Sequence, residues 1–135
     1  MRTILLVDDD EDDKSLFIES LGFLDKSIHC WTATDGQHAL NMLQYELVVL
    51  PDLIFLDLNM PKMNGHEFLR AVKDNRGLKK IPIVIYTTSS NPEDVRKTKD
   101  LGACDYLTKP SDSKNLYTKL IGILNKHLVP SYQDN

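Results

Sequence analysis

Short runs of hydrophobic residues alternate along the chain with longer stretches in which hydrophobic residues recur every three or four positions. The runs are rich in Ile, Val, Leu and aromatic residues, and they lie at Ile4–Val7, Ile28–Ala33, Leu53–Leu56, Ile83–Tyr86 and Tyr106–Leu107. They are mostly continuous, which is typical of strands buried on both faces, whereas a half-exposed strand alternates hydrophobic and polar residues. The sequence therefore predicts five buried strands.

The stretches between the runs have the spacing of amphipathic helices. Their hydrophobic residues share one helical face in five places: Leu16, Phe17, Leu21 and Leu24; Ala39, Leu40, Leu43 and Leu47; Phe68, Leu69 and Val72; Val95, Thr98 and Leu101; and Leu116, Leu120, Ile123, Leu124 and Leu128. Pro92 suits the first turn of the fourth helix, and Gly102 suits its end. Strands that alternate with helices in this way predict an α/β fold of three layers, with a parallel sheet between two layers of helices.

Polar residues stand where four of the five predicted strands end: Asp8 and Asp9, Asp57, Thr87 and Thr88, and Lys109. In a sheet of this kind, ligands bind beyond the carboxyl ends of the strands, where the strand order reverses. We therefore expect these side chains to meet at one edge of the sheet.

Three carboxylates at close quarters repel one another unless a proton or a cation neutralises them. Mg²⁺ prefers a few carboxylates together with water and phosphate oxygens, and Lys109 is a compact charge that suits a second anionic group. Such a set is typical of phosphoryl transfer, in which one carboxylate is the nucleophile. Asp57, alone at the end of the third strand, is our candidate.

The acidic run continues beyond the first strand through Asp10, Glu11, Asp12 and Asp13. These four residues fall where the first helix begins, and the helix macrodipole favours negative charge there. For them we expect a structural role that requires no ligand.

Four segments carry a resemblance to a known family: "LLVDDD", "DLIFLDLNMPKMNG", "IPIVIYTTSS" and "DYLTKP". In order and spacing they are similar to the receiver domain of two-component response regulators, over nearly the whole chain. The resemblance implies a doubly wound, flavodoxin-like fold with a five-stranded parallel sheet in the order 2-1-3-4-5. The segment "KDNRGLKKIP" and the "TTS" turn resemble single-domain receivers of the phytochrome-associated subgroup.

The resemblance implies a role for each matching position: Asp57 accepts the phosphoryl group; Asp8, Asp9, Asp57 and the backbone carbonyl of Asn59 hold Mg²⁺; Thr87 supplies the switch hydroxyl; Lys109 pairs with the phosphate; and Tyr106 is the aromatic residue that changes rotamer. It also implies a cis bond between Lys109 and Pro110. The phosphodonor would be a phosphohistidine on a sensor histidine kinase or a histidine phosphotransfer protein. Thr88 and Tyr86 are larger than the residues usual in the family, and Thr88 is expected to narrow access to the phosphoryl group.

Composition limits the remaining classes. A chain of 135 residues with net charge −4 and a pI of about 5.5 suits one domain, and its acidic balance argues against nucleic acid or an anionic membrane as the main partner, since both require a basic face. No stretch has the length of a signal peptide core or a membrane span, so we expect a cytoplasmic protein. Cys30 and Cys104 are expected to be reduced, buried thiols.

We expect a receiver domain over residues 1–129 and a short polar tail over 130–135, with no output domain. Output would then pass through contact with an unknown downstream protein. The domain would be a monomer, or a dimer through the face of the fourth helix, fifth strand and fifth helix.

Two alternatives belong to other classes. A small phosphatase could also use Asp57 as its nucleophile, but such enzymes need a proton-transferring carboxyl two residues later, and Asn59 cannot transfer protons. A degenerate receiver used only for docking is disfavoured by the intact set of Asp57, Thr87 and Lys109. We expect a switch that catalyses only its own phosphorylation and dephosphorylation.

Overall fold

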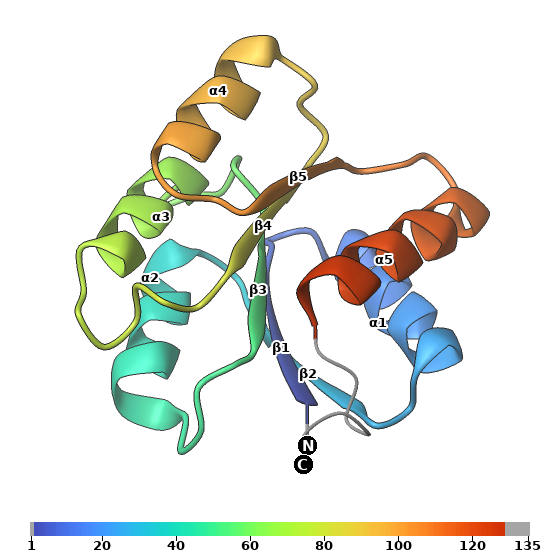
Figure 1. Ribbon diagram of the computed structural model, residues 1–135, viewed down its shortest axis with the longest axis horizontal. Coiled ribbons are helices and arrows are strands. Elements are labelled where there is room, and N and C mark those ends of the chain that lie inside the picture. The colour runs from blue at the N-terminus through green and yellow to red at the C-terminus, as the bar shows by residue number, and fades with distance from the viewer. Residues whose placement is uncertain (1, 129–135) are drawn as a thin grey trace.

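Five parallel strands form one central sheet in the order β2-β1-β3-β4-β5 in the computed structural model, which describes residues 2–128 (Figure 1). The strands are β1 (Arg2–Val7), β2 (Ile28–Ala33), β3 (Leu53–Leu56), β4 (Ile83–Thr87) and β5 (Asp105–Thr108). The expected strands and strand order are confirmed, and each strand boundary lies within two residues of the hydrophobic run that predicted it.

Helices cover both faces of the sheet: α1 (Glu11–Leu24), α2 (Gly36–Asn41), α3 (Gly65–Lys73), α4 (Pro92–Asp100) and α5 (Ser113–His127). In Figure 1, α1 and α5 lie side by side on one face, and α2 and α3 lie on the other. Alternate residues of β1 serve the two layers, because Leu5 and Val7 pack with Phe68 and Leu69 while Ile4 and Leu6 pack with helices α1 and α5. Residues on both faces of the strand are thus buried, as the continuous hydrophobic runs predicted.

Polar side chains begin the helices where the sequence predicted it. Asp10 accepts a hydrogen bond from the backbone N–H of Asp13, and Glu11, Asp12 and Asp13 form the acidic first turn of α1. Asn91 caps α4, and Pro92 occupies its first turn. Gly102 has a φ of +106°, a conformation that glycine adopts without steric cost, so it ends α4 as expected.

The second predicted helix is not uniform. Its α-helical part ends at Asn41 and is followed by a π-helical turn, η1 (Met42–Glu46), closed by the hydrogen bond from Leu47 N–H to the Met42 carbonyl at 2.8 Å. Ala39, Leu40 and Leu43 of the expected hydrophobic face are buried and Leu47 is partly buried. Met42 is buried as well, which was not expected, and the helix type was not predicted.

Three further expectations need correction. Cys30 and Cys104, both within the described residues, are free thiols as expected, but Cys104 is exposed because it lies in the connection that leads into β5. Val95, expected on the buried face of α4, is 38% exposed. No peptide bond among residues 2–128 is cis, so the expected cis bond before Pro110 is wrong; trans is the ordinary preference. The tail over 130–135 lies outside the described residues.

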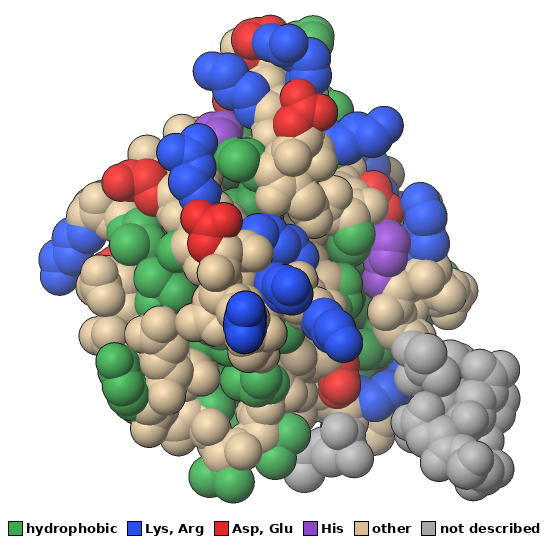
Figure 2. All heavy atoms as spheres, turned by 60° about the vertical axis from the view of Figure 1, so that its left-hand side comes forward, with side chains coloured by type: hydrophobic (Ala, Val, Ile, Leu, Met, Phe, Trp, Pro, Cys, Tyr) green, Lys and Arg blue, Asp and Glu red, His purple; other side chains and the backbone are tan. Residues whose placement is uncertain are grey.

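The basic segment between α3 and β4 is part of the folded domain. Leu78 and Ile81 are buried in the core beside α3, and Lys73 Nζ donates hydrogen bonds to the carbonyls of Lys79 and Ile81, each at 3.0 Å. Figure 2 brings this side of the molecule forward and shows Lys and Arg side chains on its surface, with acidic side chains beside them. Among residues 2–128, no helix has both the length and the hydrophobicity needed to cross a bilayer.

Candidate functional site at the carboxyl edge of the sheet

Asp8 and Asp57 continue two neighbouring strands by one residue each. The N–H of Asp8 donates to the Ala33 carbonyl at 3.0 Å, and the N–H of Asp57 donates to the Val7 carbonyl at 2.9 Å. These bonds extend the ladders β1–β2 and β1–β3, and they hold both carboxylates at the edge where the strands end. Asp8 is fully buried and Asp57 is 5% exposed, whereas Asp9 is open to solvent.

Asp8, Asp9 and Asp57 form a group in which one carboxylate oxygen from each residue lies within 4.8 Å of the other two. Burial raises the pKa of Asp8 from 3.8 to about 6, although a hydrogen bond from Lys109 opposes the rise. Carboxylates this close together, two of them buried, are stabilised by a cation, and the all-oxygen donor set fits a hard divalent ion such as Mg²⁺. The structure therefore brings the three expected metal-binding carboxylates together.

Lys109 lies at the centre of the acidic residues. Its Nζ is 2.7 Å from Oδ2 of Asp8, 2.8 Å from Oδ2 of Asp13 and 3.4 Å from Oδ2 of Asp57. Burial alone would lower the pKa of Lys109, but the hydrogen bonds to Asp13 and Asp8 and the charge of Asp57 raise it above its ordinary value. Lys109 is therefore a permanent positive charge beside Asp57.

Asp13 is a site residue that the sequence analysis missed. Its position in the first turn of α1 was expected to serve only the helix macrodipole, yet its carboxylate also contacts Lys109 from the α1 side. The signal that was available is spacing, because Asp13 follows Asp9 by four residues, about one helical turn. A carboxylate one turn into a helix that starts at the sheet edge can point back toward that edge.

Thr87 ends β4, and its side chain is fully buried. Its hydroxyl oxygen has no hydrogen-bond partner among residues 2–128, which is unusual for a buried polar group. Its carbonyl accepts a hydrogen bond from the N–H of Lys109 at 2.6 Å, so the backbones of the two residues are joined. The hydroxyl is thus free to bond a group that arrives at the site.

The loop after β3 closes the site from another side. The N–H of Asn59, an exposed residue, lies 3.4 Å from Oδ1 of Asp57, and the N–H of Gly65 donates to the Leu58 carbonyl at 3.1 Å. A Cβ added to Gly65 would lie only 2.4 Å from the carbonyl oxygen of Asp57. Glycine at this position therefore lets α3 begin directly against the backbone of Asp57.

Tyr86 borders the site from within the core. Its ring packs against Phe17 and Phe55, and its centroid is 5.4 Å from Nζ of Lys109, within the range of a cation–π contact. Burial raises the pKa of Tyr86 above its ordinary value. Thr88, by contrast, is exposed, and its expected effect on access to the phosphoryl group stays a prediction.

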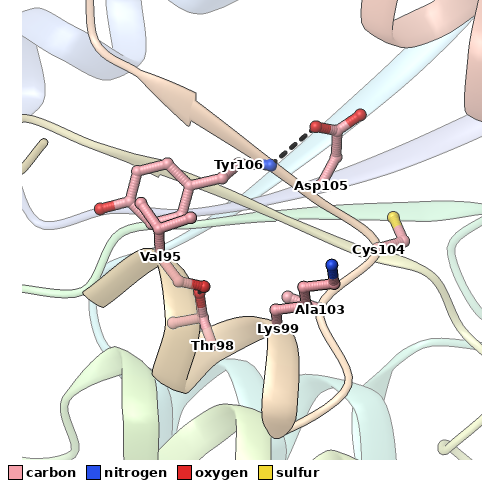
Figure 3. A pocket seen from close by; sticks show the side chains of 7 residues that line it. All are labelled: Val95, Thr98, Lys99, Ala103, Cys104, Asp105 and Tyr106. Carbon is pink, nitrogen blue, oxygen red and sulfur yellow. Dashed lines mark hydrogen bonds between the residues drawn. The ribbon is translucent and has the colours of Figure 1, made fainter. Parts of the chain in front are cut away.

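Tyr106 lies on β5, away from the acidic residues. Its hydroxyl donates to the Ser89 carbonyl at 2.7 Å, and the Ser89 hydroxyl donates to Asp94 of α4 at 2.6 Å. Tyr106 therefore contacts the loop that follows Thr87. It also lines a pocket of about 230 Å³ between α4 and β5, which Figure 3 shows with the other lining residues, Val95, Thr98, Lys99, Ala103, Cys104 and Asp105.

Comparison with known proteins places this geometry in a family. A model described as the response regulator receiver domain matches residues 4–121. Response regulator Rcp1 of Synechocystis sp. is 40% identical over 126 residues, which span 90% of this chain and 86% of Rcp1. The transcriptional regulatory protein CpxR of Escherichia coli is 33% identical over the whole of this chain, which spans 54% of CpxR.

Two solved structures share the fold. The phosphorylated cyanobacterial phytochrome response regulator RcpA aligns with a TM-score of 0.87 and 35% identity, over 94% of each chain. The Mn²⁺-bound form of response regulator Rcp1 aligns with a TM-score of 0.85 and 37% identity, over 97% of this chain and 98% of that one. The resemblance drawn from the sequence motifs is therefore confirmed, and the chain belongs to the family of response regulator receiver domains.

Proposed function

We propose that this receiver domain accepts a phosphoryl group on Asp57 from a phosphohistidine. A carboxylate oxygen of Asp57 attacks phosphorus, the phosphorus–nitrogen bond breaks, and the leaving imidazole nitrogen takes up a proton. The product on this chain is an acyl phosphate. The observation that carries the proposal is the position of Asp57, a buried carboxylate beside two further carboxylates and 3.4 Å from the Lys109 ammonium.

Mg²⁺ would be held by the carboxylates of Asp8, Asp9 and Asp57 and by the backbone carbonyl of Asn59. When bound, the ion supplies positive charge that offsets the repulsion between carboxylate and phosphoryl oxygens. The Mn²⁺-bound form of Rcp1 supports a divalent cation in this family, and the phosphorylated form of RcpA supports the phosphoacceptor role.

Lys109 and Thr87 would hold the phosphoryl oxygens from the side of β4 and β5. The ammonium supplies charge, and the Thr87 hydroxyl, which has no partner among the described residues, supplies a hydrogen bond. Movement of Thr87 toward the new group would pull the following loop, and Tyr106, bonded to Ser89 in that loop, would change its position. Phosphorylation shifts the equilibrium between the resting and the activated arrangement only by the difference between its interaction free energies with the two.

The surface altered by this switch is the one formed by α4, β5 and α5. We propose that it contacts a downstream protein, or a second copy of the domain, and that the domain acts through these contacts and not on external substrates. The donor would be a sensor histidine kinase or a histidine phosphotransfer protein. The similarity to RcpA and Rcp1 favours a kinase of the phytochrome type.

Phosphorylation by a small-molecule donor tests the assignment of Asp57. The wild-type domain, incubated with acetyl phosphate or phosphoramidate and Mg²⁺, is expected to gain the mass of one phosphoryl group. Asp57→Asn is expected to gain none. Asp52→Asn is the matched control, since Asp52 precedes the opposite end of the same strand and is exposed. A phosphoryl group on the Asp57→Asn variant would disprove the assignment.

The phosphatase alternative makes a different prediction. A phosphatase would release phosphate repeatedly from a generic ester such as p-nitrophenyl phosphate, in an Asp57-dependent manner. The switch proposed here is expected to show no such turnover, because the side chain two residues after Asp57 is an amide that cannot transfer a proton.

A further inference from the structure

Lys109 is shared unequally among three carboxylates. Its Nζ lies 2.7 Å from Asp8 and 2.8 Å from Asp13, which are good distances for charge-assisted hydrogen bonds, but 3.4 Å from Asp57, which is the limit of such a bond. The ammonium is therefore closer to Asp8 and Asp13 than to the proposed phosphoacceptor Asp57.

Water has little access to the Lys109 ammonium. The side chain of Lys109 is 6% exposed, and the ring of Tyr86, 5.4 Å away, borders the ammonium on another side. An ammonium has three N–H donors and no acceptor, so its bonds are divided among the surrounding carboxylates. The three donors already face three carboxylates, so a phosphoryl oxygen that arrives as a further acceptor has to compete for one of them.

We propose that Asp13 is a positioning residue that holds the Lys109 ammonium on the α1 side and competes with the phosphoryl group for it. The proposal rests on the function proposed above. A metal ion on Asp8 would weaken the bond between Asp8 and Lys109, because the carboxylate oxygen would then serve the ion. Asp13 is not among the proposed metal-binding residues, so it remains the competitor after the metal binds. Phosphorylation must therefore supply the free energy needed to break the contact between Asp13 and Lys109.

Beryllofluoride, formed from beryllium and fluoride, mimics a phosphoryl group on a carboxylate and measures this competition at equilibrium. With Mg²⁺ at a saturating concentration, Asp13→Asn is expected to bind beryllofluoride about fivefold to tenfold more tightly than the wild type. Unchanged or weaker binding would overturn the proposal.

Asp12→Asn is the matched control. Asp12 lies in the same turn of α1 and is exposed, so this change alters the net charge and the helix dipole interaction equally without touching Lys109. It is expected to change beryllofluoride affinity less than twofold, the range of screened surface charges. An equal gain in both variants would mean that charge alone acts, and the proposal would fail.

A double-mutant cycle separates positioning from structural effects. In the Lys109→Met background, Asp13→Asn is expected to leave beryllofluoride affinity unchanged, because the lysine through which Asp13 acts is absent. A full gain in that background would show that Asp13 acts without Lys109. Circular dichroism and thermal midpoints of each variant would verify that all of them are folded.

A second measurement does not depend on phosphorylation. Ammonium protons of lysine are visible by ¹H–¹⁵N NMR when hydrogen bonds slow their exchange with water, and the Lys109 signal is expected in the metal-free wild type and weakened or shifted in Asp13→Asn. If the wild type fails to bind beryllofluoride in an Asp57-dependent manner, the proposed function fails, while this signal still tests the contact. A Lys109 signal identical in both proteins would contradict the role of Asp13.

Discussion

The backbone N–H of Lys109 donates a hydrogen bond to the carbonyl oxygen of Thr87 at 2.6 Å. The bond joins the ends of β4 and β5, whose register pairs Thr87 with Thr108. The hydroxyl and the ammonium that we assign to the phosphoryl group therefore stand on one connected piece of backbone. When Thr87 moves, the backbone of Lys109 is therefore expected to move with it. Ser89 follows Thr87 by only two residues, so its loop is expected to move as well.

Replacement of Thr87 by valine is expected to stabilise the metal-free protein. The Thr87 hydroxyl is buried and has no partner among residues 2–128, so Thr87→Val removes an unsatisfied polar group of similar shape. We expect the free energy of unfolding of the metal-free protein to rise by about 1 kcal/mol. Urea denaturation followed by circular dichroism measures this change.

Thr98→Val is the control for that substitution. Thr98 is equally buried, but its hydroxyl donates to the Asp94 carbonyl at 2.8 Å, so the same change breaks a bond and is expected to destabilise α4. If Thr87→Val destabilises the protein as much as Thr98→Val, the Thr87 hydroxyl has a partner in the resting state and the argument is wrong.

Much of the site followed from the sequence for a simple geometric reason. The carboxyl ends of parallel strands lie at one edge, so Asp8, Asp57 and Lys109 were expected together although they are far apart along the chain. Asp13 was not expected there, because the helix macrodipole already accounted for an acid in the first turn. Which way its side chain points depends on how α1 packs against the sheet, and one sequence does not reveal that packing.

The strands of the fold were predicted from the sequence, but one change of helix type was not. Continuous hydrophobic runs such as Leu53–Leu56 are required where both faces of a strand are buried, so strands were located well. Leu43 is buried as helical spacing predicted, but Met42 is buried too, and the spacing did not indicate the π-helical turn at Met42–Glu46. The exposure of Cys104 likewise depends on a connection whose path the pattern of residues does not define.

The stability of the metal-free protein is expected to depend on the ionisation of Asp8. Burial raises its pKa to about 6 in the folded state, above the ordinary value of 3.8 that the unfolded chain retains. The unfolded state therefore loses the proton first, and the free energy of unfolding falls as pH rises from about 4 to about 6, with the full penalty present above that range. Asp8→Asn removes this penalty.

We expect Asp8→Asn to raise the free energy of unfolding by about 1–3 kcal/mol at pH 7.5 without metal, and by less at pH 5, where much of the wild-type Asp8 is protonated. Urea denaturation at the two pH values measures the difference. Asp52→Asn, at the opposite edge of the sheet, controls for the loss of a negative charge. A gain for Asp8→Asn that is larger at pH 5 than at pH 7.5 would contradict the raised pKa.

Mg²⁺ affinity is expected to fall in the same pH range. The ion needs Asp8 as a carboxylate, so a proton competes with it once the pH drops below the pKa of about 6. The apparent Kd is expected to be nearly constant above pH 7 and to rise about tenfold per pH unit well below 6, as one competing proton requires. Isothermal titration calorimetry at constant ionic strength provides the measurement, and a constant Kd between pH 7 and pH 5 would rule out competition at Asp8.

Gly65 is expected to be intolerant of any side chain, because α3 starts directly against the phosphoacceptor strand. A Cβ there would lie 2.4 Å from the Asp57 carbonyl oxygen and 2.7 Å from Cα of Leu58, and backbone atoms cannot move aside cheaply. Gly65→Ala should lower the free energy of unfolding by more than about 2 kcal/mol and slow phosphorylation by acetyl phosphate, since the backbone of Asp57 must shift.

Gly122→Ala is the opposite case in the same protein. Gly122 lies inside α5 with no atom within 4 Å of the added Cβ, so alanine is expected to stabilise the helix by about 1 kcal/mol and leave the phosphorylation rate unchanged. Urea denaturation and mass spectrometry of the two variants side by side measure both quantities. Equal stability of the two alanine variants would mean that the loop after β3 can move away from Asp57, and that its close contact does not fix the position of the acceptor.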